Sequence, residues 1–187
     1  MNNKISIFDI ESILESQTKP DRILAEITQA IALLLQADRC FLYVRDPETR
    51  YGQAAFCYCR NPEVPDVSSN KWELEQPDKL EAKDPMFAAA LHCKPSIYVE
   101  DVETADPNVV NRDFEAQEFG HRALIHGHLC QNGQLWGIWQ PCIFNSPRTW
   151  TSEDKQIMET IVTKATPLIE QYVSANIKSI KQKDKKL

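Results

Sequence analysis

An Asn-Gly pair at residues 132–133 constrains the possible folds more than any other feature of this sequence. It separates two runs rich in β-branched, aromatic and other apolar residues, 121–131 and 134–144. Both central positions of a two-residue hairpin turn need a positive φ, which Asn and Gly adopt readily. The pattern therefore predicts an antiparallel β-hairpin in the last third of the chain.

The register of this hairpin decides which side chains share a face of the sheet. If Gln131 pairs with Gln134, His126 lies opposite Trp139. Side chains two residues apart on a strand point to the same face, so His128 joins them. We therefore expect the two imidazoles and the indole ring of Trp139 to line one wall.

Turn residues and hydrophobic periodicity predict the other elements, with helices at both ends of the chain. Predicted helices cover residues 5–15, 20–37, 86–92 and 151–180, and residues 109–119 form a helix or an irregular lid. Predicted strands cover residues 39–45, 52–60, 72–75 and 96–100. This order indicates an α+β fold with a central antiparallel sheet, the terminal helices on one face and the middle segment over the other. Such a sandwich encloses a small cavity.

The chain of 187 residues has the length of a single domain. We expect an N-terminal helix in residues 1–19, the main domain in residues 20–177 and a basic tail in residues 178–187. Lysines at the end of a helix interact favourably with its dipole, and the tail could also contact a partner.

Charge and hydropathy narrow the function classes. The formal net charge of −6 argues against general nucleic-acid binding. No apolar run approaches the roughly 20 residues that a membrane span requires. Asp9 and Glu11 interrupt the apolar core that an export signal needs. We therefore expect a cytoplasmic protein whose six cysteines are reduced thiols.

Three stretches of the sequence carry a family resemblance. The first joins a helix to a strand at residues 35–44, and the second is the strand at residues 95–102. The third combines residues 122–129, Leu135-Trp136-Gly137-Ile138 and residues 146–151. Together they resemble a GAF domain, the small-molecule-sensing module of phytochromes and cyclic-nucleotide phosphodiesterases. The third stretch is most similar to the bilin-binding GAF domains of cyanobacteria.

The sequence departs from two functional subgroups of that family. Bilin-binding members carry a Cys-His pair about eleven residues before the basic position that Arg122 matches, and this chain has Asn111-Arg112 there. The thioether attachment of a bilin is therefore not expected. Members that reduce free methionine sulfoxide use clustered cysteines in the middle segment, where residues 61–120 hold Cys93 alone. A single thiol lacks a resolving partner for that chemistry.

Five residues are candidates for ligand binding: His126, His128, Trp139, Tyr98 and Phe119. Aromatic rings offer flat walls to a ring-shaped ligand, and imidazoles offer polar contacts. Each of these residues also fits an ordinary role in the core. The alternation of His126, His128 and Cys130 along one strand makes them weak candidates for metal ligands. Residues on one strand rarely converge on a metal without a bend, so satisfied histidines are the competing interpretation.

These observations predict a non-catalytic sensory or regulatory module. It would bind a small molecule or a protein partner and signal through its terminal helices in a homodimer. The main competing function is a bilin-associated photoreceptor or pigment-handling protein, so the expected cofactor is a tetrapyrrole or none. A redox enzyme using Cys93 or the pair Cys57 and Cys59 is also compatible with the sequence, as is a metal-binding module.

Overall fold

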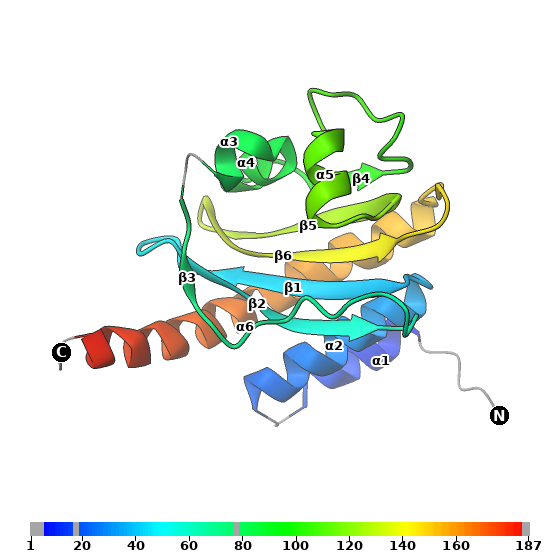
Figure 1. Cartoon of the computed structure of the whole chain (residues 1–187). Coiled ribbons are helices and arrows are strands. Elements are labelled where there is room, and N and C mark those ends of the chain that lie inside the picture. The colour runs from blue at the N-terminus through cyan, green and yellow to red at the C-terminus, as the bar shows by residue number, and fades with distance from the viewer. Residues whose placement is uncertain (1–5, 17–18, 77–78, 185–187) are drawn as a thin grey trace.

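A six-stranded antiparallel sheet forms the centre of the protein, which is described from a computed structural model (Figure 1). The structure describes residues 6–16, 19–76 and 79–184. The strand order is β3-β2-β1-β6-β5-β4, so the predicted hairpin β5–β6 pairs with β1 through β6. The strands are β1 (Arg39–Arg45), β2 (Tyr51–Cys59), β3 (Glu73–Leu74), β4 (Ile97–Val99), β5 (Ala123–Gln131) and β6 (Gln134–Ile143).

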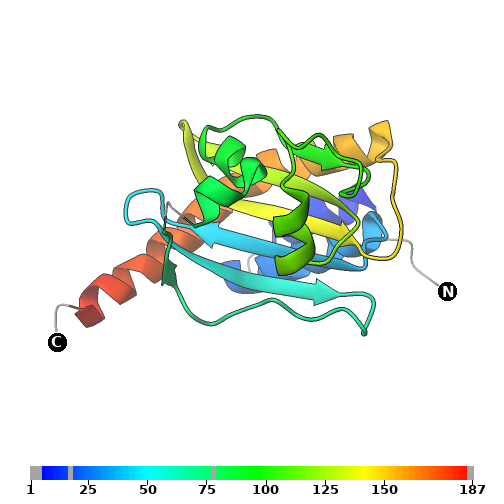
Figure 2. The same cartoon turned by 45° about the horizontal axis from the view of Figure 1, so that its top comes forward.

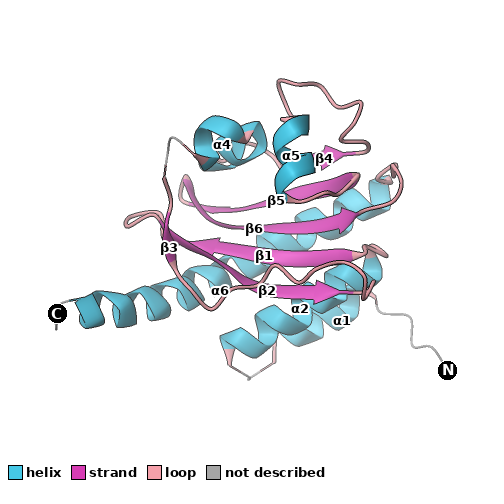
Figure 3. Cartoon of the chain, in the orientation of Figure 1, coloured by secondary structure: helices cyan, strands magenta, loops and turns pink. Residues whose placement is uncertain are grey.

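Three helices cover one face of the sheet, as the sequence predicted (Figures 1 and 3). They are α1 (Ile7–Leu14), α2 (Pro20–Leu34) and α6 (Ser152–Asp184). Thr151 and Asp154 exchange hydrogen bonds at the start of α6, forming the capping box that their spacing predicts. The end of α6 extends past the sheet (Figure 1). The last three residues of the predicted basic tail lie outside the described residues.

The middle segment covers the other face, and Figure 2 shows it lying across the front of the sheet. It contains α3 (Leu80–Lys83), α4 (Pro85–Leu91) and α5 (Arg112–Glu118). Asp84 caps α4 by accepting a hydrogen bond from the backbone N–H of Met86 at 2.9 Å. The sequence did not predict α3, which is a single turn. The predicted α+β architecture is confirmed.

The predicted register of the β5–β6 hairpin is wrong beyond its first two pairs. Gln131 does pair with Gln134, but the register then shifts and leaves Trp136 as an extra residue on β6. A β-bulge of this kind moves every later side chain by one position. Gly127, rather than His126, consequently lies opposite Trp139.

The two faces of the sheet carry separate hydrophobic cores. The helix-side core includes Leu24, Ile31, Leu42, Trp139 and Ile161, with aliphatic residues in the majority. The core under the middle segment includes Phe41, Met86, Val110, Leu124 and Cys142. Among the described residues, no helix combines the length and apolar character needed to cross a membrane.

Candidate functional site

His126 and His128 lie on the face of β5 that the middle segment covers. Their rings meet edge to face, and the Nδ1 of His126 lies 2.8 Å from the Nε2 of His128. The Nδ1 of His128 lies 2.7 Å from the carbonyl oxygen of Lys94. Because a carbonyl only accepts, the Nδ1 of His128 donates, and the Nε2 of a neutral His128 accepts from His126.

Burial keeps this histidine pair neutral. His126 is 3% exposed and His128 is 5% exposed. Burial, together with the neighbouring His128 and His121, holds the pKa of His126 well below its ordinary value. Burial also lowers the pKa of His128, against the opposing effect of its bond to Lys94. The two rings satisfy one another, which matches the competing interpretation of satisfied histidines.

Trp139 lies on the opposite face from the histidines. Its side chain is fully buried in the helix-side core, and its Nε1 donates to the hydroxyl of Thr28 on α2 at 3.0 Å. The expectation that Trp139 shares a wall with His126 is therefore wrong. The bulge at Trp136 is the physical reason, because it exchanges the faces of the residues that follow.

The other predicted residues also lie apart from one another. The hydroxyl of Tyr98 donates to Glu159 on α6 at 2.8 Å. Phe119 stacks against His121, with ring centroids 5.4 Å apart. The thiol of Cys130 lies 3.8 Å from the carbonyl oxygen of Ala90 and beside Cys93, away from the imidazole pair. In the described part of the chain, no three His, Cys, Asp or Glu side chains are arranged to hold a metal ion.

A second group of polar side chains lies under the middle segment, where β1 begins and β6 ends. We call it the Arg39 cluster, and it consists of Arg39, Phe41, Glu115, Phe119, His121, Cys142 and Phe144. Arg39 and Cys142 are direct partners in the β1–β6 pairing. The Arg39 guanidinium carbon lies 4.9 Å from the ring centre of Phe144 and 5.5 Å from that of Phe41. Aromatic rings therefore surround a buried positive charge.

Arg39 lacks the partners that a buried guanidinium normally has. The residue is 1% exposed, and its Nη1 donates to the carbonyl oxygen of Pro65 at 3.1 Å. Its Nε and Nη2 are buried and make no hydrogen bond to any described residue. Arg45, which is also buried, instead forms an ion pair of 2.9 Å with Glu75. Leaving buried donors of a charged group unsatisfied is costly, so Arg39 presents an unmet demand for an acceptor.

His121 adds a third unmet polar atom to the cluster. Its Nε2 lies 2.6 Å from the carboxylate of Glu115, and both side chains are almost completely buried. Burial opposes protonation, but Cys142 and Glu115 outweigh it and raise the pKa of His121 to about 9. Its Nδ1 makes no hydrogen bond to a described residue, and the Cys142 thiol beside the ring donates to the carbonyl oxygen of Gln140 at 3.3 Å.

Asp84 brings a further buried carboxyl group to this region. Burial and the nearby Glu115 raise the pKa of Asp84 to about 7. At neutral pH the region therefore holds two cationic side chains, Arg39 and His121. Two carboxyl groups lie beside them, Glu115 and a partly protonated Asp84. The free N–H groups of Arg39 and His121 fit an anionic ligand group, and the surrounding rings fit an apolar body.

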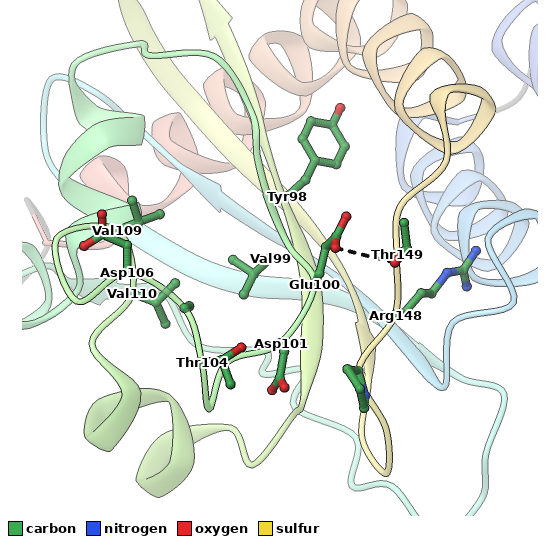
Figure 4. Close-up of a pocket in the computed structure, with 12 residues that line it drawn as sticks. Tyr98, Val99, Glu100, Asp101, Thr104, Asp106, Val109, Val110, Arg148 and Thr149 are labelled. Carbon is green, nitrogen blue, oxygen red and sulfur yellow. Dashed lines mark hydrogen bonds between the residues drawn. The ribbon is translucent and has the colours of Figure 1, made fainter.

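A cavity lies at the edge of the sheet beside β4 (Figure 4). Its volume is about 440 Å³, and it lies between β4, the loop of residues 100–110 and the loop of residues 147–149. Its lining includes Val99 and Val110, which are also members of the core under the middle segment. Tyr98 is the predicted site residue that lines it.

Sequence reasoning missed most of the Arg39 cluster. Arg39 stands at the start of an apolar strand, and Glu115 lies on a short helix that is mostly polar, so neither residue breaks a pattern. In the sequence, Cys142 is indistinguishable from an ordinary small core residue. The one available signal was the number of aromatic residues flanking these positions, and it does not identify which face they share.

Comparisons with solved structures show the same fold at low sequence identity. The GAF domain of an Acinetobacter phosphoenolpyruvate-protein phosphotransferase matches with a TM-score of 0.66 and 11% identity, covering 88% of this chain and 90% of that one. A phycoerythrobilin-bound GAF domain from a cyanobacterial phytochrome matches with a TM-score of 0.67 and 16% identity, covering 88% and 92%. A free methionine-R-sulfoxide reductase from Neisseria meningitidis, in complex with its substrate, matches with a TM-score of 0.64 and 15% identity, covering 90% and 89%.

The comparison with curated proteins found no match. The family model of the GAF domain matches residues 19–166, which is most of the chain. The predicted resemblance, drawn from the helix-to-strand junction, the middle strand and the final hairpin, is thereby confirmed. On this match, and with the sheet order and layers described above, the chain belongs to the GAF domain family.

Proposed function

We propose that this protein is a non-catalytic sensory or regulatory module that binds a small organic anion at the Arg39 cluster. The observation that carries this proposal is the buried Arg39 guanidinium with two unsatisfied nitrogens. A carboxylate or phosphate would accept both N–H groups in the bidentate geometry that a guanidinium favours. The rings of Phe41, Phe119 and Phe144 would enclose the rest of the ligand.

The site is built for binding rather than for turnover. Cys142, His121 and Glu115 have the residue types of a nucleophile, a base and an orienting acid. However, the Cys142 thiol is fully buried, and its proton goes to the carbonyl oxygen of Gln140 at 3.3 Å. His121 is protonated at neutral pH, since its pKa is about 9, and therefore cannot act as a base there.

Strand β6 links the proposed ligand site to the helix layer. Cys142 of β6 belongs to the Arg39 cluster. Trp139 on the same strand points to the opposite face and donates a hydrogen bond to Thr28 of α2. On β5, a Cβ added to Gly127 would lie 2.5 Å from the Met158 side chain of α6, so this strand and helix are in close contact. A ligand that favours one packing of the hairpin would shift α2 and α6. We propose a homodimer through the terminal helices as the form that transmits this shift.

Ligand binding is tested by thermal unfolding with a panel of probes. The panel is acetate, pyruvate, succinate, benzoate, inorganic phosphate and AMP, with wild type and Arg39→Met measured side by side. At least one anion should raise the wild-type Tm, because a ligand at about 100 times its Kd stabilises by about 2.7 kcal/mol. Arg39→Met should lose that shift. A panel without effect on the wild type, or with equal effect on the variant, would contradict the proposal.

A non-covalently held bilin is the second candidate ligand. The matched GAF domains include ones with bound bilins, and this chain keeps the Leu135-Trp136-Gly137 sequence of the resemblance. Asn111-Arg112 does not fit thioether attachment, so covalent binding there is not proposed. Co-expression with a bilin pathway should give visible absorbance that is lost on denaturing gel filtration. A colourless protein would remove this candidate.

A further inference from the structure

Two cysteines of β2 lie close enough to react with one another. The sulfur atoms of Cys57 and Cys59 are 3.8 Å apart, and both residues are partly exposed as free thiols. They are separated by one residue on a strand, so their side chains point to the same face. That face is the one under the middle segment, where Cys57 packs against the core.

A disulfide between them lies at the limit of what strand geometry allows. Residues i and i+2 of a strand are about 6.4–6.8 Å apart at Cα, given a rise of about 3.2–3.4 Å per residue. Disulfides occur with Cα separations of about 4.4–6.8 Å. The Cα separation is therefore at the upper limit of the allowed range. The Cβ atoms must also approach to about 3.5–4.5 Å, so strand β2 has to bend at Tyr58 for the bond to close.

The surroundings assign different roles to the two thiols. Burial raises the pKa of Cys57 to about 12, so it stays protonated, and it lies against the Asp66 carboxylate and the backbone N–H of Val67. Cys59 lies opposite Arg39 in the β1–β2 pairing. Cys59 is thus the candidate for the first attack, and Cys57 is the thiol placed to resolve the product.

We propose that Cys57 and Cys59 form a redox modification site, which hydrogen peroxide converts into an intramolecular disulfide and a dithiol reductant restores. The inference is independent of the ligand proposed for the Arg39 cluster. It concerns modification of this protein rather than an enzymatic activity of it.

The steps balance in atoms and electrons. The Cys59 thiolate attacks one oxygen of the peroxide, the O–O bond breaks, and the products are Cys59 sulfenic acid and hydroxide. Cys57 then attacks the sulfenic sulfur, and its proton passes to the sulfenic hydroxyl group, which departs as water. Two thiols lose two electrons in total, and one peroxide is reduced to two waters. A dithiol reverses the bond by thiol–disulfide exchange.

Oxidation of Cys57 and Cys59 would affect the Arg39 cluster through the loop of residues 61–70. Cys57 contacts Asp66 and Val67 of this loop, and the carbonyl oxygen of neighbouring Pro65 accepts the hydrogen bond of the Arg39 Nη1. Disulfide formation removes the Cys57 proton that interacts with Asp66. We therefore expect the loop, and with it the cover of Arg39, to change on oxidation.

Peptide mass spectrometry tests this proposal. Trypsin cleaves after Arg50 and Arg60 and therefore releases both cysteines in one peptide. Folded protein is treated with equimolar peroxide, alkylated under denaturing conditions and digested. The peptide of residues 51–60 should lose about 2 Da and escape alkylation, since the disulfide has two hydrogens fewer. Prior treatment with dithiothreitol should restore full alkylation. The fully buried Cys40 and Cys142 serve as internal controls that stay alkylatable.

Two variants separate the roles of the thiols. In Cys57→Ser, dimedone should trap a sulfenic acid on Cys59, because no thiol is left to resolve it. In Cys59→Ser, Cys57 should stay unlabelled. If the wild-type peptide keeps two alkylatable thiols, or gains oxygen without losing two hydrogens, the proposal is wrong. The main measurement uses the wild type, so it tests the disulfide even if one of the variants fails to fold.

Discussion

The two faces of the sheet are built from different chemistry. The helix side has an apolar core in which the buried hydroxyl of Thr28 both donates to Leu24 and accepts from Trp139. The side under the middle segment buries Arg39, Asp84, Glu115, His121, His126 and His128. One face thus resembles an ordinary protein core, whereas the other holds charge that costs folding free energy. The second face is where binding and modification are proposed.

This contrast predicts which face tolerates substitution. Apolar packing loses stability when atoms are removed, because the cavity left behind is not refilled. A buried charge without a partner loses little when it is replaced by an apolar group of similar size. Removing apolar atoms should therefore cost most on the helix side, whereas replacing the unpaired charge on the other face should cost little. The following predictions test this in decreasing order of effect.

Trp139→Ala should cause the greatest loss of stability. Trp139 is fully buried in the helix-side core, so its removal should cost about 3–5 kcal/mol of unfolding free energy. Phe119→Ala on the other face should cost about half as much, because Phe119 is partly exposed. Urea unfolding followed by circular dichroism measures both variants. Equal losses would show that the two cores are equivalent.

Arg45→Met and Arg39→Met compare a paired with an unpaired buried arginine. Arg45→Met should lose about 3–5 kcal/mol, because it removes the close ion pair of the buried Glu75 carboxylate and leaves it the Tyr43 hydroxyl and the more distant Arg50. Arg39→Met should change stability by less than about 1 kcal/mol or increase it, since it removes an unsatisfied charge. Both variants are measured without added anion. A large loss in Arg39→Met would assign Arg39 a structural role instead.

His121 should make the protein less stable as the pH rises. Its folded pKa of about 9 exceeds its ordinary value of 6.5, so its contribution is complete below pH 6.5 and lost as the pH approaches 9. The wild type should therefore lose about 1 kcal/mol more per pH unit than His121→Gln between pH 7 and 8.5, while Asp84, whose pKa is about 7, adds a loss that both proteins share. His121→Gln removes only the histidine's part of this slope. If both proteins show the same slope, another group titrates.

His126 should have the opposite effect in acid. Its folded pKa lies well below 6.5, so its contribution is present above pH 6.5 and lost as the pH falls. Asp84 opposes this trend, since its raised pKa favours the folded state as the pH falls toward 4. The difference between wild type and His126→Gln isolates the histidine, and should be at most about 1.4 kcal/mol per pH unit. A pH-independent difference between pH 5 and 6.5 would contradict the prediction.

Periodicity and turn residues were enough to predict the order of the elements. The boundaries of β1, the N-caps of α4 and α6 and the sheet-forming hairpin all follow from local sequence, because each is a short-range backbone requirement. The family resemblance rested on the same local signals. The predicted pairing of His126 with Trp139 failed because a bulge depends on packing from both sides of the sheet.

Local sequence was therefore sufficient for the α+β architecture, its layers and the membership of the GAF domain family. Which residues meet under the middle segment depended on tertiary packing. Arg39, Cys142 and the neighbouring Glu115 and His121 come from three separate places in the chain, and no local spacing relates the three. They are buried because α5 and residues 61–70 cover them. The unpaired buried charge of Arg39 therefore exists only once the sheet and these covering segments have packed together.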